Sequence, residues 1–157
     1  MKTINLVLVL LVGSASIAAQ QSSHSTRVTT VTTPIDMQHL IGRWKMRSGG
    51  PGLTFMPDLS FSTTEGEGGV GHGTYSLSGN VLVLTYHTDG ADDTILTNTV
   101  VMQGSTMLLF QVEQRVKDQV WTYNQNLTLP RSHKIVMTDP KGHKQMVDGG
   151  ATAYVRY

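Results

Sequence analysis

Six histidines raise the question of a metal site in this 157-residue chain: His24, His39, His72, His87, His133 and His143. None stands at the H-x-x-x-H or H-E-x-x-H spacing of metal-binding helices, and the chain has no cysteine. His72 and His87 are equally far from a Gly79-Asn80 turn, so we expect them to face each other across a hairpin. With Glu65 or Glu67 they could hold a divalent ion, but surface histidines beside a strand are the commoner arrangement. We therefore predict no metal and no cofactor.

The sequence also contains no recognisable catalytic motif. It has no G-x-S-x-G elbow, no nucleophilic cysteine and no S-x-x-K. Asp89, Asp92 and Asp93 lie together after Tyr86-His87, where a solvated charge cluster is the usual explanation. We predict a protein without catalytic residues. A barrel enzyme that uses Asp, His and Tyr at its mouth is the minor alternative.

A glycine-rich segment matches G-x-G-x-x-G at Gly66, Gly68 and Gly71. That pattern binds dinucleotides when a helix follows it and its N-terminus holds phosphate. Here a predicted strand follows, and Glu65 and Glu67 would repel phosphate. We expect a loop between two hairpins, placed where it could cover the mouth of a barrel.

The composition fits one globular domain. Charged residues make up 15% and apolar residues 39% of the chain, which is too apolar for global disorder. The formal charge of +1 excludes a nucleic-acid binder that relies on a broad basic face. Abundant threonine and valine among 16 glycines favour strands and turns over helices.

The N-terminus resembles an export signal. Residues 1–19 combine Lys2, an apolar run at Leu6–Val12 and small residues before a cleavage point after Ala18 or Ala19. That run is far shorter than the ~20 residues that cross a bilayer, so we expect no membrane span. Residues 20–33 are rich in Ser and Thr and predict a flexible tether before a domain at 34–157. We expect a secreted or periplasmic protein, and the absence of cysteine favours a bacterial one.

Within the domain, one short helix precedes a series of strands. Thr33-Pro34-Ile35-Asp36 has the pattern of a capping box, and Gly42 ends the helix that it predicts, about two turns long. From Arg43 onward the apolar pattern has a period of two. The expected strands lie in 43–47, 53–62 (two strands), 72–87 (two strands), 94–102, 107–116, 119–124, 134–138, 143–147 and 152–157. Short turns between them predict an all-β antiparallel meander of eight to ten strands, closed into a barrel or folded into a sandwich.

Gly42-Arg43-Trp44 after a short helix, followed by hairpins such as GTYSLSGNVLVLTY and a final TAYVRY, resembles the lipocalin-like (calycin) barrels. The resemblance covers residues 34–157 and implies that Arg156 packs over Trp44 and closes the barrel. In the related fatty-acid-binding barrels an arginine and a tyrosine on the last strand hold a lipid carboxylate. Here Tyr154 and Arg156 have the reverse order.

The barrel implied by this resemblance predicts non-enzymatic binding of a small, largely apolar ligand. The side chains expected to line the interior are Met46, Phe55, Tyr75, Leu84, Phe110 and Trp121, with Tyr86, His87 or Arg156 at a polar end. The alternative is an envelope or exported module with a solidly packed barrel. Such a module would contact a protein or glycan through loops 64–73 and 88–93.

Overall fold

The computed structural model describes residues 33–64 and 70–157. The predicted signal peptide, nearly all of the predicted tether and residues 65–69 of the glycine-rich segment lie outside the described residues. Over the described ranges, no helix has the length and apolar character needed to cross a membrane.

Eleven strands follow one 3-10 helix, η1 (Met37–His39). The strands are β1 (Gly42–Met46), β2 (Leu53–Phe55), β3 (Ser60–Thr63), β4 (His72–Ser78), β5 (Val81–His87), β6 (Thr94–Gln103), β7 (Thr106–Val116), β8 (Gln119–Tyr123), β9 (His133–Thr138), β10 (Lys144–Gly149) and β11 (Thr152–Arg156). Every predicted strand is present, with ends that differ by one or two residues. The period of two therefore identified the strands correctly.

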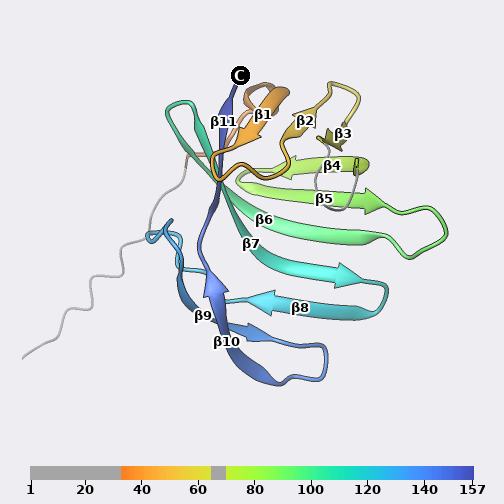
Figure 1. Cartoon of the computed structure of the whole chain (residues 1–157), viewed down its shortest axis with the longest axis vertical. Coiled ribbons are helices and arrows are strands. Elements are labelled where there is room, and N and C mark those ends of the chain that lie inside the picture. The colour runs from red at the N-terminus through yellow and green to blue at the C-terminus, as the bar shows by residue number, and fades with distance from the viewer. Residues whose placement is uncertain (1–32, 65–69) are drawn as a thin grey trace, which may run out of the picture.

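Eight of these strands close into an antiparallel barrel, as expected for a lipocalin-like fold. Going round the barrel, β11, β1, β2, β3, β4, β5, β6 and β7 pair in turn, and β7 pairs again with β11. The remaining strands β8, β9 and β10 continue the sheet beyond β7, and we call them the wing (Figure 1). The sandwich alternative is thereby excluded, and the three wing strands exceed what a simple closed meander predicts.

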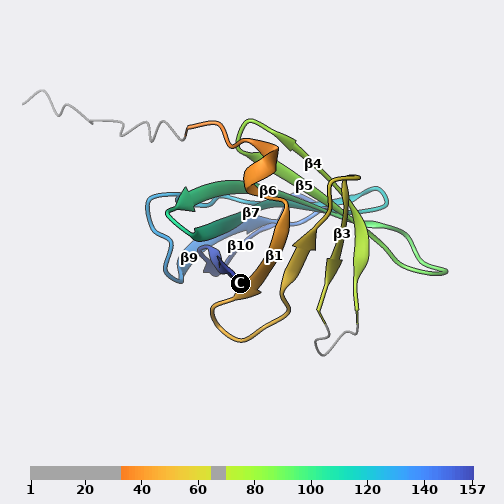
Figure 2. The same ribbon diagram turned by 90° about the horizontal axis from the view of Figure 1, so that it is seen from above.

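The short helix differs from the prediction in type, length and cap. It is a single 3-10 turn, and its N-cap is Asp36, whose carboxylate accepts a hydrogen bond of 3.0 Å from the Gln38 amide. Asp36 therefore takes the capping position predicted for Thr33. The segment before η1 binds the β4–β5 turn, where the Ile35 amide donates to the Gly79 carbonyl at 3.2 Å (Figure 2). These contacts place η1 over one end of the barrel.

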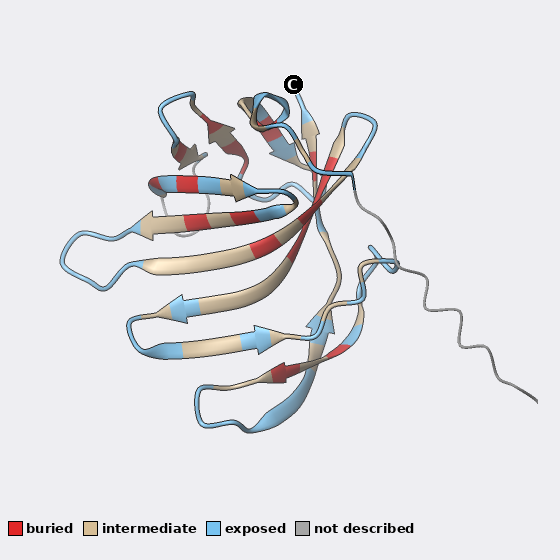
Figure 3. Ribbon diagram, turned by 180° about the vertical axis from the view of Figure 1, so that it is seen from behind, coloured by how far each residue is buried: buried red, intermediate tan, exposed pale blue. Residues whose placement is uncertain are grey.

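That end of the barrel is closed by a packed core. Leu40, which directly follows η1, is fully buried beside Trp44, whose indole Nε1 donates to the Leu40 carbonyl at 2.7 Å. Buried residues concentrate in the barrel strands, whereas β8 and β10 carry none (Figure 3). Leu82 and Leu84 of β5 and Trp44 of β1 are buried, and the inward position expected for Leu84 agrees with this.

Arg156 completes this closure in the way that the resemblance implied. Its guanidinium carbon lies 5.0 Å from the centroid of the Trp44 ring. Its Nη2 also donates to the carbonyls of His39 at 3.0 Å and Ile41 at 2.8 Å. Gly42 has a φ of +129°, which favours glycine, and a side chain there would point at the guanidinium. The last strand, the first strand and η1 are thus joined at the closed end.

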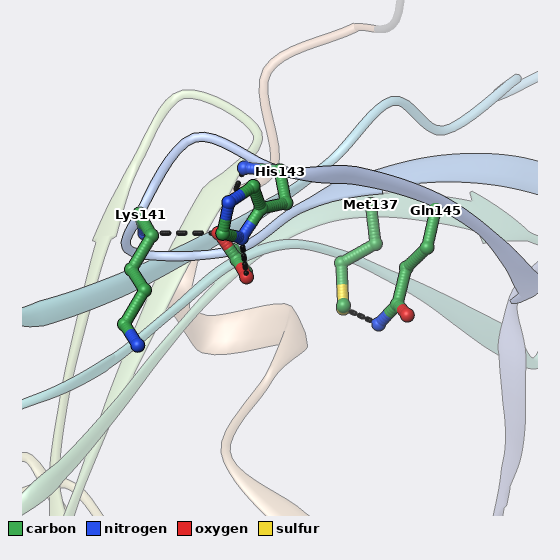
Figure 4. Close-up of polar contacts among 5 residues, drawn as sticks. Met137, Lys141, His143 and Gln145 are labelled. Carbon is green, nitrogen blue, oxygen red and sulfur yellow. Dashed lines mark hydrogen bonds and ion pairs between the residues drawn. The ribbon is translucent and has the colours of Figure 1, made fainter.

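The wing hairpin between β9 and β10 is stabilised by one carboxylate. Asp139 accepts hydrogen bonds from the backbone amides of Lys141 at 2.9 Å and His143 at 2.8 Å (Figure 4). Its other oxygen lies 3.0 Å from Nδ1 of His143. This is the behaviour expected of an Asp at the start of a tight turn.

Candidate ligand-binding site

The candidate site forms where β7 exchanges one neighbour for another. Residues 106–109 of β7 pair with β11, whereas residues 113–116 pair with β8. We call the gap between β8 and the start of β11 the fork. Because neither strand pairs with the middle of β7, the barrel wall opens there.

A cavity of about 570 Å³ occupies the inner side of the fork, and we call it the fork pocket. This volume lies in the range of small-molecule sites. Leu53, Leu84, Leu96 and Leu109 supply its apolar wall. The remaining lining residues are Tyr86, Asn98, Gln111, Gln114, Tyr123, Gln125, Ser132, Asp148, Gly149, Gly150, Ala151, Thr152 and Tyr154.

Amide side chains give the fork pocket its polar character. Gln114 Oε1 accepts from Gln111 Nε2 at 3.3 Å and from the Tyr123 hydroxyl at 3.4 Å. Both ends of the Gln125 amide are hydrogen-bonded: its Nε2 donates to the Gln111 carbonyl, and its Oε1 accepts from the Gly150 amide, both at 3.0 Å. Among the described residues, Gln114 Nε2 and Gln111 Oε1 have no protein partner. Both amides thus keep groups that can donate to a ligand and accept hydrogen bonds from it.

Asn98 is the buried polar residue of the barrel. Only 5% of its surface is exposed, and a register shift between Thr97 and Asn98 sets it beside Gln111 on the neighbouring strand. Within the described part of the chain, its side chain makes one long hydrogen bond, 3.4 Å to the Leu96 carbonyl of its own strand. An amide this deeply buried is unfavourable if its remaining hydrogen-bonding groups are covered without a partner.

Three tyrosines of the fork pocket remain neutral phenols over the physiological range. Burial, and secondarily the nearby Tyr86, raises the pKa of Tyr154 to about 12. Burial also raises the pKa of Tyr86, and it raises that of Tyr123 against the opposing effect of a hydrogen bond with Gln111. Their hydroxyls can therefore donate as well as accept hydrogen bonds.

The fork pocket contains little charge. No Lys, Arg or His is among its described lining residues. Its one carboxylate, Asp148, is largely exposed and lies 2.8 Å from Lys134 Nζ. An anionic ligand would find no positive partner there.

A second cavity, the mouth pocket, has a volume of about 580 Å³. It shares Leu53, Tyr86 and Tyr154 with the fork pocket, so the two meet at these three side chains. Met46, His72 and His87 also line it. Both pockets lie at the end of the barrel opposite η1, which makes this end hollow while the other is packed.

His72 and His87 pair across β4 and β5 as predicted, with ring centroids 6.4 Å apart. Nδ1 of His87 lies 3.1 Å from the Asp93 carboxylate, and both groups are exposed. The described residues contain no group of three His, Asp or Glu side chains placed to hold a metal ion. Glu65 and Glu67, which the sequence suggested as further ligands, lie outside those residues.

Of the predicted contact residues, three line a cavity. Met46 lines the mouth pocket, Leu84 the fork pocket and Tyr86 both. Of the polar groups, His87 lines the mouth pocket, whereas Arg156 belongs to the closed end.

Four of the predicted contact residues do not line either cavity. Phe55 and Tyr75 belong to the packed core, where their ring centroids are 4.9 Å apart. Phe110 is fully buried, and it lies on the face of β7 opposite Leu109 and Gln111, which line the fork pocket. Trp121 pairs with Gln114 but stays outside both linings.

The site residues that sequence reasoning missed are the amides and Tyr123, together with Leu53, Leu96 and Leu109 of the apolar wall. Asn98 carried a usable signal, because it interrupts the apolar face that Leu96 and Val100 share. Tyr154 is not among the predicted contact residues; it entered the sequence analysis only beside Arg156, in the reverse order of the carboxylate-binding pair of the fatty-acid-binding barrels. The structure separates the two, with Tyr154 at the pockets and Arg156 on Trp44.

Comparison with known proteins gives no relative: no family model, no curated protein and no solved structure matches this chain.

Proposed function

We propose that this protein binds a small ligand non-covalently in the hollow half of its barrel, as a lipocalin-like carrier does. The observation that supports this most is the uneven filling of the interior. One end is packed by Leu40, Trp44 and their neighbours, while the other holds two adjoining cavities of about 570 and 580 Å³. A barrel that served only as a scaffold for loops would gain stability by filling this space.

The lining suggests a ligand with both apolar and polar parts. Burial of apolar ligand surface against Leu53, Leu84, Leu96 and Leu109 would contribute about 25 cal/mol per Å² before the costs of binding. The amides and phenols would fix the orientation of the ligand. The mainly apolar contact set expected from the sequence, with Tyr86, His87 or Arg156 at a polar end, is thus extended by amide groups.

The proposal includes export and the absence of catalysis. Residues 1–19 have the composition of a cleaved signal peptide, which would place the carrier outside the cytoplasm, secreted or periplasmic. His87 and Asp93 form an exposed pair, without a nucleophile among their described contacts. We therefore favour a binding protein over an enzyme.

Native mass spectrometry of the chain purified from its own host tests this function. We expect an adduct of small-molecule mass that is lost on denaturation. Leu96→Trp would fill the fork pocket and should remove the adduct, whereas Val81→Trp, at a 43% exposed position, should keep it. An unliganded mass for the wild-type chain, with no uptake from fatty-acid, retinoid and haem panels or from a host extract, would reject the carrier function.

A further inference from the structure

We propose that the fork pocket selects a neutral, hydroxyl-rich ligand such as a small saccharide, and not a lipid anion. This inference rests on the proposed function, since it names the class of ligand that the barrel would bind. It starts from the charges. A fatty acid or phosphate ester needs a cation, and the described lining of the fork pocket contains none.

The arginine of the last strand, Arg156, is engaged at the packed end of the barrel. Arg156 donates to the carbonyls of His39 and Ile41 and lies over Trp44 at the packed end. Tyr154 therefore faces the cavities without the arginine that would complete a carboxylate site. The lipid-binding pair of the fatty-acid-binding barrels is thus absent from this pocket.

Apart from the exposed carboxylate of Asp148, the polar side chains that line the fork pocket are neutral and include both donors and acceptors of hydrogen bonds. Gln114 Nε2 is a donor, and Gln111 Oε1 and Asn98 Oδ1 are acceptors, none of them paired within the described residues. A sugar hydroxyl donates one hydrogen bond and accepts others, so adjacent hydroxyls can satisfy this mixture. The phenols of Tyr86 and Tyr154 add two more groups that both donate and accept.

Asn98 points most directly to a ligand of this class. It is 95% buried in a leucine-lined region, and its remaining hydrogen-bonding capacity faces the cavity. A purely apolar ligand would seal this amide away from water without a partner, which is unfavourable. A ligand hydroxyl would satisfy it, while Tyr86, Tyr154 and the leucines would pack against the C–H face of a sugar ring.

Competition against Nile red, a neutral apolar dye, tests the class of ligand separately from binding itself. The competitors are a panel of neutral mono- and disaccharides, and palmitate as the lipid anion. We expect at least one saccharide to displace the dye and palmitate to be at least about tenfold weaker, because its carboxylate finds no cation. Asn98→Leu, which keeps the side-chain size, should weaken saccharide binding about tenfold or more and leave dye binding intact.

Asn124→Leu is the matched control, because Asn124 is exposed and lines neither the fork nor the mouth pocket. Gln111→Met is a second test if Asn98→Leu does not fold. Palmitate binding tighter than every saccharide, or saccharide binding unaffected by both pocket variants, would overturn the inference. So would dye binding without binding of any saccharide, which leaves the carrier function standing. If neither the dye, palmitate nor any saccharide binds, the carrier function itself fails.

Discussion

The side-chain amide of Gln125 donates a hydrogen bond of 3.0 Å to the backbone carbonyl of Gln111. Gln111 lies in the stretch of β7 that has lost β11 as a neighbour and has not yet gained β8. The other end of the Gln125 side chain accepts from the Gly150 amide, just before β11. One side chain therefore bridges the fork, where the sheet itself cannot supply hydrogen bonds.

Removing this bridge is expected to loosen the fork. Gln125→Leu leaves a backbone carbonyl and a backbone amide without partners, which should cost about 1–3 kcal/mol of unfolding free energy. Denaturant unfolding measures the loss, with Gln119→Leu as control because Gln119 is exposed at the start of β8. Equal stability of the two variants would show that the bridge does not hold the fork together.

The closed end offers a second test, at Arg156. Arg156→Ala removes the contact with Trp44 and two charge-assisted hydrogen bonds to the segment around η1. Because the arginine is exposed, the loss stays moderate, and we expect about 1–3 kcal/mol of unfolding free energy. Arg43→Ala is the matched control, since Arg43 lies 5.8 Å from the Tyr157 ring at an exposed position. A loss no larger than that of the control would argue against a closing role for Arg156.

Gly73 is required by close packing between β4 and β5. A Cβ atom there would clash with the Thr85 carbonyl oxygen and would stand 3.0 Å from the Phe61 ring. We expect Gly73→Ala to destabilise the barrel by about 3 kcal/mol or more. Gly90→Ala separates this clash from backbone strain, because Gly90 has a φ of +72° but nothing within 4 Å, and should cost about 1–2 kcal/mol. Thermal unfolding of both variants measures the two losses of stability. If Gly73→Ala is as stable as Gly90→Ala, the close approach of the Thr85 carbonyl to Gly73 is contradicted.

Stability should fall at alkaline pH because of Tyr154. Its pKa is raised from 10.0 to about 12, mainly by burial, so the folded state disfavours loss of the proton. The stabilisation is full below pH 10 and is lost as the pH rises from 10 to about 12. Tyr154→Phe should flatten this part of the pH–stability curve without abolishing the fall, because burial also raises the pKa of Tyr86. Tyr157→Phe, at a 60% exposed position, should leave the curve unchanged, and identical curves for all three proteins would contradict the assignment.

How far the sequence predicts this molecule depends on how local each feature is. Alternation within a strand and a Gly79-Asn80 turn are local, so β4 and β5 follow directly from residues 72–87. The fork depends on two strands, β8 and β11, that pair with β7 from different parts of the chain. No short pattern in β7 predicts where its neighbour changes from one to the other. Phe110 illustrates the difficulty: β7 is apolar on both faces, so composition alone could not say which face lines the interior.

Asn98 shows the opposite case, in which the sequence itself carries the signal. It interrupts an apolar strand face, and a polar residue at such a position is unfavourable unless it has a function. Selecting the largest apolar side chains as contacts found Leu84 and Met46 but also selected Phe55 and Tyr75, which the core needs. At η1 the predicted capping residue is Thr33, but Asp36 caps the turn instead, because its carboxylate reaches the Gln38 amide.

Chemical-shift mapping on the isotope-labelled chain, titrated with a small-molecule extract of its own host, tests most directly where a ligand binds. Binding inside the hollow half predicts perturbed signals for Leu84, Asn98 and Tyr154, with signals around Trp44 unchanged. Perturbations confined to the exposed loop at residues 88–93, with the Leu84 and Asn98 signals unmoved, would contradict binding in the barrel and favour an interaction module.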